Sequence, residues 1–73
     1  MTNEMKKYAY QDIIDGWKRD IVEAESKIAE LESRFFGKVF SKEYKDGINM
    51  ANRTITIAKE EIAKYEAKLA ELN

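Results

Sequence analysis

The sequence predicts an all-α protein, an antiparallel two-helix coiled-coil hairpin that assembles into a helical-bundle oligomer. Apolar residues recur at alternating steps of three and four through both halves of the chain, and no proline interrupts them. This periodicity is typical of a coiled-coil seam, which an internal proline would disrupt. The chain also has only 73 residues, with no cysteine or histidine. Residues 1–73 therefore form one small domain without disulfide or zinc support, and we expect copies of the chain to support one another.

The first helix is predicted over residues 9–36 and the second over residues 42–72. The seam of the first comprises Tyr10, Ile14, Trp17, Ile21, Ala24, Ile28, Leu31 and Phe35. The seam of the second comprises Tyr44, Ile48, Ala51, Ile55, Ala58, Ile62, Tyr65, Leu69 and Leu72. With a turn between them, residues whose numbers sum to about 79 face each other. Three consecutive layers then pair an isoleucine with an alanine, which keeps the volume of each layer even.

The turn is predicted at residues 37–41. Gly37 can take the left-handed conformation that ends a helix after Phe36. Ser41 can cap the second helix, whose first turn holds Glu43 near its positive end. An alternative starts the second helix at Gly47, after a longer loop with the sequence SKEYKDG.

Several apolar residues lie off the seam and predict further association. They are Val22, Ala29 and Phe36 in the first helix and Met50 and Ile57 in the second. On a helical wheel the two sets project to opposite flanks of the hairpin. An apolar flank on each side suits a four-helix dimer or a larger closed assembly, and the alternative is ordinary scattered surface apolar residues.

Charge and hydropathy limit the classes of partner. The net charge is −1, with −4 over residues 11–33 and +3 over residues 34–45. So small a basic excess argues against binding to duplex DNA, which relies on neutralising phosphates. No apolar segment approaches the length that spans a bilayer, and the N-terminus lacks the apolar run of a signal peptide. We expect a soluble, cytoplasmic protein.

The composition argues against an enzyme. Without histidine and cysteine, the chain lacks the commonest general base and the strongest nucleophile. Carboxylates such as those of Glu23, Glu60 and Glu61 have Lys27 or Lys64 within helical reach, which indicates surface ion pairs. The Glu-x-x-His motif of carboxylate di-iron bundles is absent. We expect no catalytic residues, no metal site and no cofactor.

A first candidate site lies in the sequence NMANRTIT, residues 49–56. Asn49, Arg53 and Thr56 follow a four-then-three spacing and so share one outward strip of the helix. An arginine between an amide and a hydroxyl can clamp a phosphate or a carboxylate. The alternative is ordinary helix surface, with a threonine bonding back to the preceding turn.

A second candidate site is the tip of the hairpin. Its basic residues are Arg34, Lys38, Lys42 and Lys45, and its aromatic residues include Phe36, Phe40 and Tyr44. Such a mixture can hold the bases and phosphates of a nucleotide. The structural alternative places Phe35 and Tyr44 in the last core layer, with Phe40 covering the turn. Phe36, Val39, Phe40 and Lys38 are the residues we expect to contact a partner.

A third candidate is Tyr8, in the sequence MKKYAY. Tyr10 fits the seam, whereas Tyr8 does not. Tyr8 is either an ordinary surface residue or a stacking residue in a neighbouring subunit's pocket.

The string NRTITIAKEEI, residues 52–62, resembles the final helix of small phage proteins that sequester cyclic oligonucleotides, the anti-CBASS sponges. The family pattern is close to Ser-Arg-x-x-Ser-Leu-Ala-x-x-x-Leu. Arg53 matches its arginine, Thr56 its serine, and Ile57, Ala58 and Ile62 its packing residues. The resemblance implies a multimer of helical hairpins with ligands held between subunits.

The resemblance does not extend to the N-terminal half. The family has a tyrosine there, followed fifteen residues later by a lysine. In this chain Tyr10 is followed at that distance by Glu25, and Tyr8 by Glu23.

These observations predict a non-enzymatic protein with one of two functions. The first is a phage counter-defence sponge that holds a cyclic oligonucleotide between subunits at Arg53, Thr56, Asn49 and Tyr8. The alternative is a protein-interaction module of the phage inhibitor or adaptor type, which binds a host defence protein through its tip or flank. Binding of single-stranded nucleic acid by the tip is a third hypothesis, and the acidic first helix weakens it.

Overall fold

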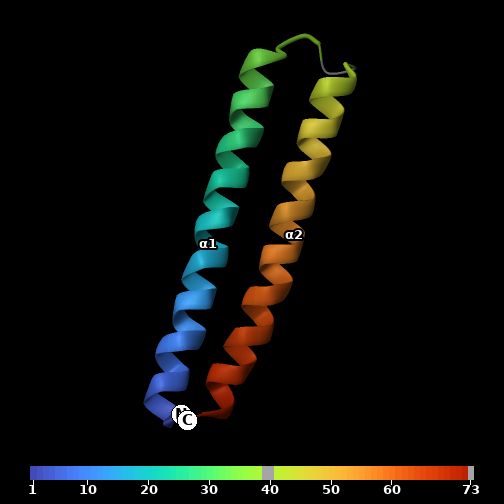
Figure 1. Cartoon of the computed structure of the whole chain (residues 1–73). Coiled ribbons are helices and arrows are strands. Elements are labelled where there is room, and N and C mark those ends of the chain that lie inside the picture. The colour runs from blue at the N-terminus through green and yellow to red at the C-terminus, as the bar shows by residue number, and fades with distance from the viewer. Residues whose placement is uncertain (39–40, 73) are drawn as a thin grey trace.

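A computed structural model of the chain describes residues 1–38 and 41–72. Helix α1 spans Asn3–Arg34 and helix α2 spans Lys42–Glu71. The helices lie side by side and antiparallel, so the start of α1 and the end of α2 both lie at the end of the hairpin opposite the turn (Figure 1). The Cα atoms occupy a rod of 53 × 14 × 14 Å. The predicted all-α hairpin is thereby confirmed, whereas its assembly into an oligomer stays a prediction.

Helix α1 begins at Asn3, so the predicted start near residue 9 is wrong. Thr2 has extended backbone angles, and its side-chain hydroxyl accepts a hydrogen bond from the Met5 amide at 3.2 Å. That geometry is an N-cap, and Glu4 in the first turn lies at the positive end of the helix. The seam begins only at Tyr10, but the cap rather than the seam decides where this helix starts.

The turn contains Gly37 at φ +78°, so its predicted left-handed conformation is confirmed. Helix α1 ends at Arg34, two residues before the predicted end at Phe36, because Phe35 leaves helical geometry at φ −105° and ψ 26°. The Phe35 amide still donates to the Leu31 carbonyl at 2.9 Å, and the Lys38 amide donates to the Phe35 carbonyl at 2.7 Å. These two bonds satisfy groups that the end of a helix leaves free.

Ser41 caps helix α2, as predicted. Its hydroxyl accepts a hydrogen bond from the Tyr44 amide at 3.2 Å, and Glu43 lies in the first turn. Gly47 lies inside α2, so the alternative that starts the second helix at Gly47 is wrong. The predicted helix 42–72 agrees with the observed one to within a residue at its end.

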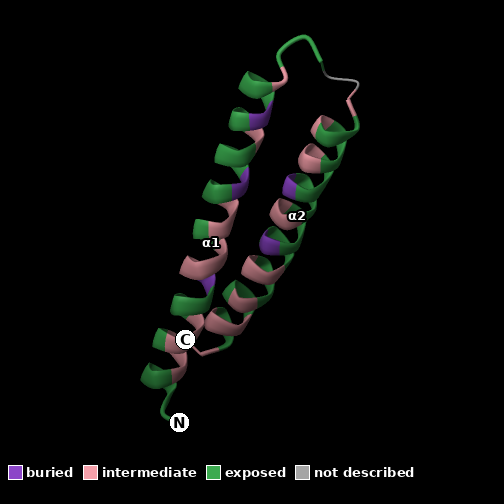
Figure 2. Cartoon of the chain, turned by 45° about the horizontal axis from the view of Figure 1, so that its top comes forward, coloured by how far each residue is buried: buried purple, intermediate pink, exposed green. Residues whose placement is uncertain are grey.

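The core is a narrow seam between the helices, and Figure 2 shows its buried positions turned toward the opposite helix. Its buried residues are Ile14, Ala24, Leu31, Ala51 and Ala58. Near the turn the rings of Phe35 and Tyr44 meet edge to face, with centroids 6.2 Å apart, as the predicted pairing requires. At the open end the ring of Tyr10 contacts that of Tyr65, at 5.6 Å. The pairing rule places Tyr10 opposite Leu69, one turn further on, and a coiled-coil side chain fits between residues of successive turns.

Neither α1 nor α2, within the residues described, is long and apolar enough to cross a membrane.

Candidate functional site

The polar strip formed by Asn49, Arg53 and Thr56 lies on α2, and all three side chains are exposed. The seam residues of α2 face α1, and the strip occupies the opposite side of the same helix. Helical geometry places the three residues one above another over two turns. The sequence spacing therefore located a continuous polar surface correctly, and its ligand stays a prediction.

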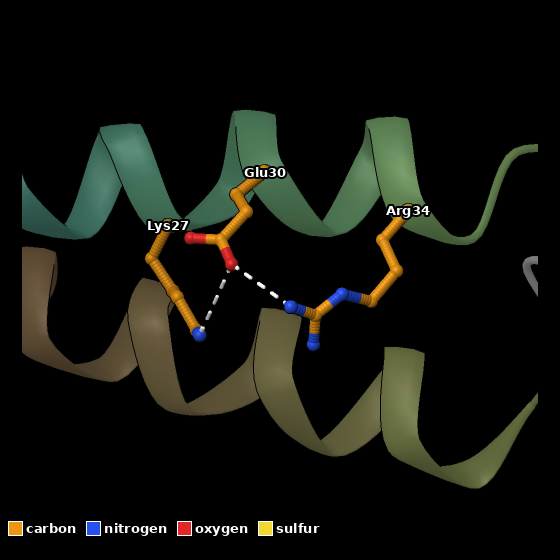
Figure 3. A network of polar contacts seen from close by, with 3 residues as sticks. All are labelled: Lys27, Glu30 and Arg34. Carbon is orange, nitrogen blue, oxygen red and sulfur yellow. Dashed lines mark hydrogen bonds and ion pairs between the residues drawn. The ribbon is translucent and has the colours of Figure 1, made fainter.

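Arg34 illustrates how an arginine of this protein is satisfied by its own helix. Its guanidinium donates to Glu30 Oε1 at 3.2 Å, and Lys27 Nζ lies 4.0 Å from the same oxygen (Figure 3). All three side chains are more than half exposed, so this network contributes little to stability. The network does give the guanidinium of Arg34 a carboxylate partner, Glu30, within its own helix.

Arg53 differs, because no carboxylate lies within helical reach of it. The residues three and four positions away are Asn49, Met50, Thr56 and Ile57. Within residues 1–38 and 41–72 its guanidinium forms no hydrogen bond and no ion pair. Arg53 is thus an exposed cation with its five N–H donors available to an external anion.

The hydroxyl groups beside Arg53 behave differently from each other. Thr54 bonds back to its own helix, donating from Oγ1 to the Met50 carbonyl at 3.2 Å. A threonine of this segment thus bonds back to the preceding turn, as the alternative interpretation of ordinary helix surface expects, and that threonine is Thr54. In the described part of the chain the Thr56 hydroxyl has no such bond, so it can contribute to a ligand site with Arg53.

Tyr8 is 76% exposed and lines a hollow of about 460 Å³ at the open end of the hairpin. The lining residues are Glu4, Lys7, Tyr8, Gln11 and Leu69. By the pairing of the helices Tyr8 is level with about residue 71, so about 18 residues, or about 27 Å along the axis, separate it from Arg53. One hairpin does not bring Tyr8 and the polar strip together.

The tip of the hairpin is divided between core and surface. The Phe35 and Tyr44 rings pack on each other, so the structural interpretation of this pair is confirmed. Phe36 is 90% exposed and Lys38 is also exposed. The predicted partner-binding residues Val39 and Phe40 lie outside the described residues.

A groove of about 300 Å³ between the helices was missed from the sequence. It is lined by Asp20, Glu23, Ala24 and Lys27 of α1 and by Gly47, Met50, Ala51 and Thr54 of α2. The sequence signal was present, because Ala24 and Ala51 are small residues on the seam and leave space where a larger side chain would fill it. Met50 stands at this groove with 73% of its surface exposed.

The described residues contain no group of three or more acidic, histidine or cysteine side chains that could hold a metal ion. Comparisons with protein-family models, with curated proteins and with solved structures find no match to this chain. The resemblance of residues 52–62 to the sponge family accordingly stays a prediction.

Proposed function

We propose that this chain is a non-enzymatic binding protein whose assembled hairpins capture a phosphate-bearing ligand at the polar strip of Asn49, Arg53 and Thr56. The observation that carries the proposal is the exposed Arg53 guanidinium, which has no partner in the described residues. The resemblance of residues 52–62 suggests the ligand class, a cyclic oligonucleotide, and hence the function of a phage counter-defence sponge.

The chemistry of the strip supports a phosphate ligand. A guanidinium binds a phosphate through two parallel N–H···O bonds, and charge-assisted bonds of this kind are about twice as strong as neutral ones. The Asn49 amide and the Thr56 hydroxyl, one turn to either side of Arg53, add donors to the remaining oxygens. Because α2 is a regular helix at these positions, the three groups are held in a fixed relation before the ligand arrives.

A cyclic oligonucleotide suits an assembly because it carries several equivalent phosphates around a ring. Each Arg53 can take one phosphate, and symmetry-related copies can present several arginines to one ligand. Binding through several weak sites held in one assembly is much stronger than binding through one.

Isothermal titration with cyclic dinucleotides and trinucleotides tests the proposal. We expect the native chain to bind one of them and Arg53→Ala to weaken binding by about 1.5–3 kcal/mol, the value of a hydrogen bond to a charged group. Arg19→Ala is the matched control, because Arg19 is an exposed arginine of α1 with carboxylates four residues away at Asp15 and Glu23.

An absence of binding heat with every cyclic nucleotide would contradict the sponge proposal. So would equal losses in Arg53→Ala and Arg19→Ala, since these would indicate non-specific charge attraction. Native mass spectrometry of protein purified from its own cells adds an independent measurement, because it reports subunit number and any retained nucleotide together.

A second candidate function, a protein-interaction module that binds a host defence protein, is favoured by one feature of the tip. Phe36 is 90% exposed, and a large aromatic side chain so placed beside the cation of Lys38 is typical of an interface anchor. The test uses a photo-crosslinking residue at position 38, with position 60 on the exposed surface of α2 as control. We expect an adduct specific to position 38 that Phe36→Ala removes, whereas adducts shared by both positions would contradict this function.

A further inference from the structure

One flank of the hairpin carries an apolar surface that the fold leaves uncovered. This groove flank consists of the groove itself together with Ile13, Gly16, Met50 and Ile57. Met50 lines the groove, and Ile57 follows it by seven residues, two turns along the same face of α2. Ile13 precedes the groove residue Asp20 by the same interval on α1. The exposed fractions are 37% for Ile13, 73% for Met50 and 41% for Ile57.

Gly16 adds an independent indication that something packs on this flank. It lies three residues after Ile13, hence on the same face of α1, in the middle of the helix. A Cβ built at Gly16 would meet only the Arg19 guanidinium, at 3.8 Å, so packing within the chain does not require a glycine there. A glycine inside a helix is unfavourable unless another backbone approaches it closely.

The accessible surface supplies the quantitative argument. The chain exposes 5624 Å², whereas a compact monomer of its mass of 8.5 kDa exposes about 4,700 Å². The excess of about 900 Å² is slightly more than the area of about 800 Å² that each partner contributes to a standard interface. One partner of standard size would thus cover the surplus.

We propose that a second copy of this chain covers the groove flank, related to the first by a two-fold axis. The flank is complementary to itself, because it combines protruding apolar side chains with a depression. The protruding side chains are those of Met50 and Ile57, and the depression lies over Ala24, Gly47 and Ala51. In a two-fold interface both copies present the same surface, so each can insert its side chains into the other's groove. Arg53 lies three residues after Met50 and four before Ile57, so it stands at the outer edge of this flank. The pairing is argued from the apolar surface and does not depend on the proposed ligand function.

Sedimentation equilibrium of the whole chain tests the pairing. We expect the native chain to have twice the mass of 8.5 kDa, and Ile57→Lys to raise the dissociation constant of the pair about tenfold or more by placing a charge in the interface. Val22→Lys is the matched control, because Val22 is 62% exposed on the opposite flank. We expect it to leave the pair intact, with circular dichroism confirming that both variants remain helical.

A second variant keeps the test decisive if Ile57→Lys unfolds. The chain has no cysteine, so Ile57→Cys places one small apolar thiol on the groove flank and Val22→Cys places one on the other flank. A short bismaleimide should join Ile57→Cys chains into covalent dimers and leave Val22→Cys chains largely unjoined. Gly16→Ala should weaken the pair even though alanine favours the helix.

Three results would overturn the pairing. The first is a native chain that remains a monomer at millimolar concentration. The second is a pair that Val22→Lys dissociates and Ile57→Lys does not, and the third is a higher multiple that both variants break.

Discussion

The side chain of Leu31 occupies the space that a side chain at Gly47 would need. A Cβ on Gly47 would come within 2.6 Å of one Leu31 methyl carbon and 3.3 Å of the other. Leu31 is only 5% exposed, so it has little freedom to move aside. Glycine at position 47 is therefore a requirement of helix packing, although it weakens helix α2 by about 1 kcal/mol relative to alanine.

Gly47→Ala should destabilise the protein despite the better helix propensity of alanine. Overpacking against Leu31 costs about 1–3 kcal/mol, and the propensity gain offsets about 1 kcal/mol of that. We expect a net loss of up to about 2 kcal/mol in the free energy of unfolding, measured by urea denaturation.

The same substitution in a Leu31→Ala background supplies the control. Leu31→Ala removes the methyl carbons that a Cβ at Gly47 would meet, so Gly47→Ala should there become stabilising. The two substitutions are in contact, and their effects should be strongly non-additive. Additive effects would show that the contact between these residues does not limit position 47.

Gly37→Ala should lower the free energy of unfolding by about 1–2 kcal/mol, because an alanine at φ +78° brings its Cβ close to the following carbonyl oxygen. Gly37→Asn should lose less, since asparagine tolerates this region better than other residues. Both changes leave the space around the residue open, as nothing lies within 4 Å of a Cβ built there. Equal losses for the two variants would contradict the conformational explanation.

Ser41→Ala should cost about 1 kcal/mol through loss of the hydrogen bond from the Tyr44 amide. Ser41→Asp should retain most of the stability, because aspartate caps as well as serine. Thr2→Ala removes a similar cap at the open end, where the first turn of α1 is exposed and can fray at small cost. We expect a smaller change in the thermal midpoint for Thr2→Ala than for Ser41→Ala, and the reverse order would contradict this reasoning.

The ring pair Tyr10–Tyr65 should stabilise the open end of the hairpin. Its centroids are 5.6 Å apart, and Lys68 Nζ lies 5.8 Å from the Tyr10 ring centre and 4.9 Å from that of Tyr65. A double-mutant cycle of Tyr10→Leu and Tyr65→Leu should give a coupling of about 0.5–1.5 kcal/mol. Lys68→Met, which keeps the length of the side chain without its charge, should cost about 0.5–1 kcal/mol.

Most of the fold could be predicted from the sequence because the spacing of apolar residues specifies a coiled-coil seam. The steps of three and four located both helices, and the pairing rule predicted the contact of Phe35 with Tyr44. Gly37 and Ser41 located the turn, since a left-handed residue and an N-cap each favour a few residue types. The start of α1 was missed because only the Thr2 cap marks it, eight residues before Tyr10, the first residue of the seam.

The candidate site was predictable only in part. The spacing of Asn49, Arg53 and Thr56 defines a face of a helix, and a face follows from periodicity alone. The separation of Tyr8 from this strip, and the groove beside Met50, depend on how the helices pair. The volume of a groove between two helices depends on where small residues of both helices fall in the same layer. The periodicity of apolar residues within one helix does not specify this.

The buried seam contains no polar or charged side chain among the residues described. In coiled coils a single buried polar residue fixes how two helices align, and apolar layers alone discriminate weakly between alignments. The alignment in this hairpin consequently depends on the covalent turn and on the fit of Leu31 over Gly47. Cleaving the backbone within the turn would allow the two helices to shift by a heptad relative to each other. It would also allow a helix of one molecule to pair with a helix of another in a longer, domain-swapped bundle.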